Sequence, residues 1–226
     1  MPTTPLYITS YPRSGNTWVQ RLLSDILDSP LKTIPEMTPV WYGDKGGDYV
    51  VVKRHSKERE GRTCFVYRDP RDVAVSRWFY YDLPSLESAI KGMIEANNGD
   101  RYGPNGVWIG PYEPFITHWW NNPNLAECQI EYSTLHTAPV DTLHDAVFDL
   151  TGLDTPRDKI VLAVERQSFG EQVKRLGAEH AMRKGIIGDW RNHFDPECAK
   201  LITDHLGDLM MRQGFIDSLR WYESLY

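Results

Sequence analysis

Short apolar runs alternate with longer amphipathic segments along this chain. Apolar or alternating runs at residues 6–10, 49–52, 63–67 and 128–132 are typical of β-strands, the second and third being short enough and apolar enough to be buried. Apolar residues at helical spacing predict helices over 18–27, from about Pro70, and over 140–150, 156–166 and 196–211, with Asp195 as the N-cap of the last. Strands that alternate with helices favour an α/β fold whose central parallel sheet is flanked by helices.

One segment breaks this alternation. Residues 99–114 contain four glycines and three prolines, which is typical of a surface loop. We interpret the segment as a loop or lid rather than a domain boundary, so a single domain covering residues 1–226 is expected.

Composition and charge exclude several classes of protein. A net charge of −6 argues against nucleic-acid binding through the whole surface, so any anion site must be a local group of cations. Three cysteines without a Cys-x-x-Cys pair predict neither a disulfide framework nor a metal site, and they fit the cytoplasm. No signal peptide is recognised, and no apolar stretch approaches the ~20 residues that span a membrane.

The first candidate anion site follows the first predicted strand. A polar turn with Arg13 leads into a helix whose free N–H groups favour an anion, and Gly15 lets the backbone come close to it. The donors of this turn are Arg13, Ser14, Gly15, Asn16 and Thr17.

This turn keeps only the outline of a nucleotide-triphosphatase phosphate loop. Gly15 and Thr17 fit that pattern, but Ser10 replaces its first glycine and Asn16 its lysine. We therefore expect a single P-loop-type domain that binds a different anionic leaving group.

A second candidate anion site follows the strand at 63–67. Arg68 at the strand end and Ser76 in the next helix are placed to meet at one anion. Arg71 and Asp72, between them, are interpreted as a solvated pair in the first helical turn.

A third group of cations lies near the C-terminus. Arg183 and Lys184 precede Gly185, so two adjacent cations lie beside a turn that can wrap a phosphate. His193, a few residues later, is assigned a structural role.

Two further residues follow the strand at 49–52. Lys53 and His55 are expected at the carboxyl edge of the sheet, where open α/β sheets place their sites. Histidine is the side chain best suited to accept a proton near neutral pH, so His55 is the candidate general base.

Together these motifs resemble the sulfotransferases that use 3′-phosphoadenosine 5′-phosphosulfate (PAPS). Residues 11–18 look like that family's 5′-phosphosulfate loop, residues 68–76 its 3′-phosphate segment, and residues 183–190 its Arg-Lys-Gly-x-x-Gly-Asp-Trp segment. Lys53 to His55 resembles its Lys-x-His segment. Many cytosolic members carry Lys where this chain has Arg13, which retains an electrostatic role but does not donate a proton.

The resemblance implies a role for each matched residue. His55 would be the general base, with Lys53 and Arg13 stabilising the transferred sulfonate and the leaving phosphate. Arg68, Ser76, Arg183, Lys184 and Gly185 would bind the 3′-phosphate. The nucleotide base would meet Trp18, Tyr132, Gln167, Ser168 and Phe169, although core packing competes for Tyr132 and Phe169.

The acceptor is expected to be a small molecule with a hydroxyl or amine. Aromatic residues are available to line its pocket and suggest an apolar or aromatic alcohol. They are Trp41, Tyr42, Tyr80, Tyr81 and Trp108.

Two alternatives compete with this interpretation. A P-loop kinase would need a lysine near Asn16 and an acidic Mg²⁺ ligand at a strand end, and we assign neither. A non-catalytic nucleotide-binding module would leave Lys53 and His55 without a role.

Overall fold

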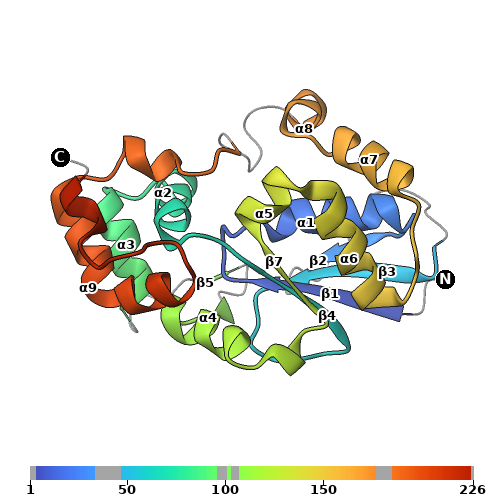
Figure 1. Ribbon diagram of the computed structural model, residues 1–226, viewed down its shortest axis with the longest axis horizontal. Coiled ribbons are helices and arrows are strands. Elements are labelled where there is room, and N and C mark those ends of the chain that lie inside the picture. Colours follow the sequence, from blue (N-terminus) through green and yellow to red (C-terminus); the bar gives the residue numbers. More distant parts are fainter. Residues whose placement is uncertain (1–3, 34–46, 96–100, 103–106, 177–184, 225–226) are drawn as a thin grey trace.

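A computed structural model describes residues 4–33, 47–95, 101–102, 107–176 and 185–224 of the chain (Figure 1). Its central sheet has five parallel strands in the order β2-β3-β1-β4-β7. The strands are β1 (Thr4–Ser10), β2 (Leu31–Thr33), β3 (Tyr49–Arg54), β4 (Arg62–Tyr67) and β7 (Cys128–Glu131). The predicted α/β fold with a parallel sheet is confirmed, and β2 is an addition.

Most predicted helices form close to their expected bounds. The helices are α1 (Asn16–Ile26), α2 (Pro70–Tyr80), α3 (Leu86–Ile94), α4 (Tyr112–Trp120), α5 (Tyr132–Thr137), α6 (Pro139–Thr151), α7 (Arg157–Arg166), α8 (Phe169–Leu176) and α9 (Pro196–Arg212). Asp195 caps α9, because its side chain accepts a hydrogen bond from the Cys198 N–H. Short 3₁₀ turns lie at η1 (Pro123–Leu125), η2 (Asp189–Asn192) and η3 (Trp221–Ser224).

Two expectations about local structure were wrong. Tyr132, expected as the end of a strand, is the first residue of α5. The segment 99–114 is not loop throughout, because β5 (Arg101–Tyr102) pairs with β6 (Val107–Trp108) and α4 begins at Tyr112.

The two faces of the sheet bury separate cores. Leu6 and Ile8 of β1 pack with α1, α6 and α7, whereas Phe65 of β4 packs with α2, α4 and α9. This follows from the alternation of side chains along each strand. In Figure 1, α1 and α6 lie on one side of the sheet and α4 on the other, with α2, α3 and α9 beyond the ends of the strands.

The parallel arrangement determines where a site forms. All five strands run in one direction, so the segments after β1, β3, β4 and β7 leave the sheet at the same edge. The three described cysteine thiols are buried and free. Within the described residues, no helix has the length and apolar character needed to cross a membrane.

Candidate active site

The turn between β1 and α1 has unusual backbone geometry. Arg13 and Gly15 have φ angles of 71° and 100°, in the left-handed region. A Cβ atom on Gly15 would lie 2.5 Å from the ring of Tyr132. Glycine is therefore required here for two reasons, the backbone conformation and the close approach of Tyr132.

The side chains of this turn connect it to β3. Lys53 Nζ donates a hydrogen bond to Thr17 Oγ1 over 3.2 Å, and Asn16 Nδ2 donates to the carbonyl of Arg54 over 3.4 Å. The hydroxyl of Ser14 is fully buried and has no hydrogen-bond partner among the described residues. A buried hydroxyl without a partner is costly, so an external acceptor or donor is expected beside Ser14.

His55 lies directly after β3 and is buried, with 8% of its surface exposed. Its Nδ1 lies 2.7 Å from the carbonyl oxygen of Ser10. Because a carbonyl only accepts, Nδ1 carries the hydrogen, and the lone pair of the neutral ring is on Nε2. This tautomer suits a general base.

Burial sets the protonation of His55. Its pKa is lowered to about 3, chiefly by desolvation and also by the charges of Lys53 and Arg13, while the bond to Ser10 opposes the shift. The simple expectation of a pKa near ~6.5 is therefore corrected downward.

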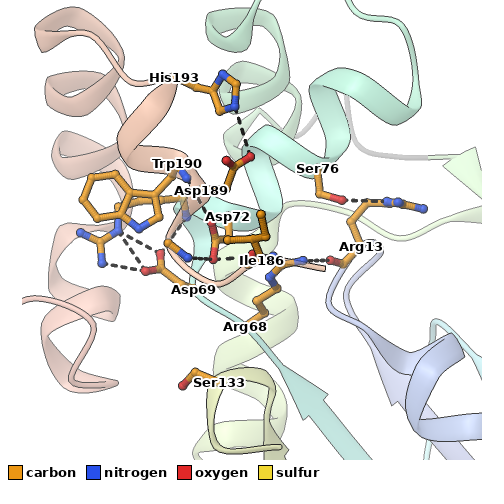
Figure 2. Close-up of polar contacts among 12 residues, drawn as sticks. Arg13, Arg68, Asp69, Asp72, Ser76, Ser133, Ile186, Asp189, Trp190 and His193 are labelled. Atoms are coloured by element: carbon orange, nitrogen blue, oxygen red, sulfur yellow. Dashed lines mark hydrogen bonds and ion pairs between the residues drawn. The ribbon is translucent and has the colours of Figure 1, made fainter. Parts of the chain in front are cut away.

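Arg13 extends along α2. Its Nε donates to Ser76 Oγ over 3.2 Å (Figure 2). Its guanidinium carbon lies 3.8 Å from the ring centroid of Tyr80. The loop after β1 and the predicted 3′-phosphate segment are thus joined through two of their predicted site residues.

Arg68 lies where three segments of the chain meet (Figure 2). Its guanidinium donates to the carbonyl oxygen of Ile186 over 3.2 Å and makes a long contact of 3.5 Å to that of Arg13. It also lies 3.6 Å from Asp72 and 4.3 Å from the ring centroid of Tyr132. Its buried Nε has no hydrogen-bond partner among the described residues.

Arg71 and Asp72 are not the solvated pair that was expected, because they are 5% and 3% exposed. Arg71 forms a two-point ion pair with Asp69 and donates to the carbonyl of Phe215 over 2.7 Å. Its guanidinium carbon also lies 4.0 Å from the ring centroid of Trp190 and 4.6 Å from that of Trp221. Asp72 instead accepts from the backbone N–H groups of Gly188 and Trp190. Each charge is buried because the C-terminal segments supply its partners.

The aromatic residues form a group beside the loop. Trp18 lies against Tyr132 and His136, at ring-centroid distances of 5.8 and 4.7 Å. Its indole N–H donates to the carbonyl of Gln167 over 3.0 Å. The side chain of Gln167 bonds Asp25 of α1, so Gln167 meets the aromatic group through its backbone.

The remaining base-site residues lie near α8. Ser168 caps the start of α8 with its hydroxyl, and Phe169 is 37% exposed. A Cβ atom on Gly185 would lie 3.2 Å from the Phe169 ring, so these two residues are neighbours.

Several predictions fall outside this description. Arg183, Lys184, Trp41 and Tyr42 lie outside the described residues, as does the side chain of Trp108. Tyr80 and Tyr81 stack edge to face near Arg13.

Other histidines have partners of their own. His118 bonds the carbonyl of Lys57 over 2.9 Å, and His193 lies 3.2 Å from Asp189 and packs against Phe79. Sequence reasoning missed two features of the site. These are the contact of His136 with Trp18 and Tyr132 and the bonds from Asp72 to backbone N–H groups. Both depend on partners that are distant in sequence, which no local motif indicates.

A pocket of about 290 Å³ lies beside Arg68. Asp72, Tyr132, Gly188 and Gln213 are among the residues that line it. The arrangement as a whole offers buried polar donors and the neutral imidazole of His55 at a single sheet edge, which suits transfer of an anionic group to an acceptor that loses a proton.

Comparison with known proteins agrees with this chemistry. The model of the sulfotransferase domain matches residues 49–214. Sulfotransferase 1 family member D1 of Mus musculus is 22% identical over 236 aligned positions, which cover 84% of this chain and 77% of the relative. Cytosolic sulfotransferase 3 of Arabidopsis thaliana is 21% identical, covering 98% of this chain and 80% of the relative.

Solved structures share the fold. Mouse sulfotransferase SULT7A1 complexed with PAP aligns with a TM-score of 0.71 at 19% identity, covering 99% of this chain and 89% of that one. Retinol dehydratase in complex with androsterone and the inactive cofactor PAP aligns with a TM-score of 0.65 at 17% identity, covering 92% and 82%.

The protonation of His55 is open to direct measurement. In the ligand-free protein, the imidazole should stay neutral between about pH 5.5 and 8, because burial lowers its pKa to about 3. The NMR signal of its Cε1 proton, assigned by its loss in His55→Gln, should not move over that range. A midpoint near ~6.5 would contradict the account.

The same shift makes stability depend on pH. The unfolded chain binds a proton at His55 near ~pH 6.5 and the folded chain does not. The free energy of unfolding therefore contains the full contribution of neutral His55 above about pH 6.5 and loses it progressively as the pH falls toward about 3.

Proposed function

Since this chain belongs to the sulfotransferase domain family, we propose that its site transfers a sulfonate group to a hydroxyl or amine of a small-molecule acceptor. The protein is a sulfotransferase, and its donor is PAPS, which leaves as 3′-phosphoadenosine 5′-phosphate (PAP). When bound, the donor supplies the sulfonyl group and a phosphate leaving group.

The observation that carries this proposal is a pair of buried polar atoms without described partners. Ser14 Oγ lies in the loop after β1 and Arg68 Nε at the end of β4. Anionic oxygens would satisfy both atoms. The residues present therefore fit a nucleotide with phosphate groups at two positions.

The 5′ end of the donor is assigned to the loop. The backbone N–H groups at the start of α1 and the hydroxyls of Ser14 and Thr17 would bind it. Lys53, which already donates to Thr17, would hold the sulfonate. Arg13 would stabilise the leaving phosphate as that group gains negative charge. Arg13 lies close enough to this region for its charge to lower the pKa of His55.

The 3′-phosphate is assigned to Arg68 and Ser76. Both contact Arg13, whose side chain donates to Ser76 and whose carbonyl accepts from Arg68. Gly185 belongs to the same proposal, and Arg183 and Lys184 remain sequence predictions. The base is assigned to Trp18, Tyr132 and Phe169. Gln167 would position Trp18, because its carbonyl accepts the indole N–H. Ser168 would position Phe169, because its hydroxyl caps the helix that begins at Phe169.

His55 is the proposed general base. Its Nε2 has the lone pair because Nδ1 donates to Ser10, and its neutral state persists at physiological pH. It would take the acceptor proton as the oxygen attacks the sulfur.

The proposal also covers the class of acceptor, the cellular compartment and the extent of the domain. Tyr80 and Tyr81, beside Arg13, support an aromatic or apolar alcohol. The name of the cytosolic Arabidopsis relative and the three free thiols support a cytoplasmic protein. We also retain one domain over residues 1–226.

Sulfonate transfer and kinase chemistry respond differently to metal removal. Lys53, Arg13 and backbone N–H groups would carry the charge stabilisation that a kinase obtains from Mg²⁺. With PAPS labelled in the sulfonate and a panel of phenols and alcohols, labelled product should form and should persist in EDTA. Loss of all transfer, restored by Mg²⁺, would contradict this and favour the kinase.

Replacing the base should separate chemistry from binding. His55→Ala should lower turnover of an aliphatic alcohol about 10²–10⁴-fold, the usual contribution of a positioned base, and leave PAP affinity nearly unchanged. An acidic phenol, already ionised, should lose less. His118→Ala, a histidine bonded to Lys57, is the matched control and should retain turnover. Normal turnover of the alcohol by His55→Ala would show that the base lies elsewhere.

A further inference from the structure

Asp72 is in the second motif, residues 68–76, and contacts the third, but it is assigned to neither anion site. We propose that Asp72 is a positioning residue that holds Arg68 and the segment from Gly185 to Trp190 together, so that both meet the 3′-phosphate of the donor. The inference rests on the proposed function, because it presumes that this phosphate binds at Arg68.

Two backbone groups of the third motif bind one carboxylate. Asp72 Oδ2 accepts from the Gly188 N–H over 2.8 Å, and Oδ1 accepts from the Trp190 N–H over 3.2 Å (Figure 2). Asp72 is in the first turn of α2, 116 residues before Gly188 in the chain. These bonds therefore place the third motif directly against the second.

The same carboxylate faces Arg68. The Nη2 atom of Arg68 lies 3.6 Å from Asp72 and also donates to the carbonyl of Ile186 over 3.2 Å. Arg68 and the third motif thus touch each other and share Asp72 as a common partner. A movement of the carboxylate would change the position of both.

The partners of this carboxylate oppose the effect of its burial. Burial raises the pKa of Asp72 and the nearby charge of Asp69 adds to the rise, whereas the Arg68 charge and the two backbone N–H groups limit it. A buried carboxylate without those partners would be costly, so the three groups are mutually required. This interdependence favours one arrangement of Arg68 relative to the segment.

The geometry of Gly188 limits other arrangements of that segment. Its φ angle is 75°, and a Cβ atom there would lie 2.5 Å from Arg191 Nη1. The segment therefore turns, at the point where its N–H meets Asp72, through a left-handed backbone conformation that favours glycine.

A second carboxylate of the same turn provides a matched control. Asp69 also lies at the start of α2, where it caps the helix and binds Arg71 rather than Arg68. Asp69→Asn removes the same charge from the same turn without removing a partner of Arg68 or of the third motif.

The test compares two nucleotides that differ only in the 3′-phosphate. Calorimetric binding of PAP and of adenosine 5′-phosphate is measured for the unaltered protein, Asp72→Asn and Asp69→Asn. Asp72→Asn should weaken PAP binding about tenfold, the scale of one charged hydrogen bond, and change adenosine 5′-phosphate binding little. Asp69→Asn should leave the ratio of the two affinities unchanged.

The possible outcomes distinguish failure of the role proposed for Asp72 from failure of the proposed function. If the unaltered protein shows no preference for PAP, the proposed function fails, and the role of Asp72 with it. If it prefers PAP and Asp72→Asn keeps the full preference, only the role of Asp72 is overturned. Equal loss for both nucleotides would show a general structural role and would also overturn it.

A second measurement applies where Asp72→Asn does not fold. Amide hydrogen exchange at Gly188 and Trp190 is followed in the unaltered protein at equal occupancy by either nucleotide. PAP should slow exchange at both amides more than adenosine 5′-phosphate does, because Arg68 and its shared partner become fixed. Equal protection by the two nucleotides would contradict the proposal.

Discussion

The guanidinium of Arg68, whose side chain is 12% exposed, is the group on which the candidate site depends. It lies between the carbonyls of Arg13 and Ile186, beside the carboxylate of Asp72 and over the ring of Tyr132. A charge with little exposure must be paired and hydrogen-bonded, so the segments that supply these partners are held near one another. The buried Nε of Arg68 has no hydrogen-bond partner among the described residues.

The parallel sheet makes this meeting of distant segments simple. Residues after β1, β3, β4 and β7 leave the same edge, although they are spread over more than half of the chain. His55, the loop after β1 and Arg68 therefore come from separate segments on one rigid support, and these are the groups proposed as base, donor loop and phosphate-binding arginine. The C-terminal segment then joins this edge through Asp72 and Arg71, which bind its backbone.

The sequence predicts those features of the fold that depend on residues close together in the chain. Apolar runs predict β1, β3 and β4, and the described motif residues that follow these strands lie at the predicted edge. The three-residue β2 is too short for a pattern. Tyr132 was expected in a strand but begins a helix, and its partners Gly15 and Trp18 are too distant in sequence to be read from a local pattern. Arg71 and Asp72 resemble any solvated pair until the backbone groups that bury them are known. The depressed pKa of His55 is likewise a consequence of burial, which no spacing of residues reveals.

The central claim is that one nucleotide spans the loop after β1 and the end of β4. A crystal structure of the protein with PAP tests it most directly. The account predicts the 3′-phosphate within hydrogen-bond distance of the Arg68 guanidinium and Ser76 Oγ. It also predicts the 5′-phosphate on the backbone N–H groups of residues 14–17 and the adenine against Trp18. PAP bound in the reverse orientation, or away from Arg68, would contradict it.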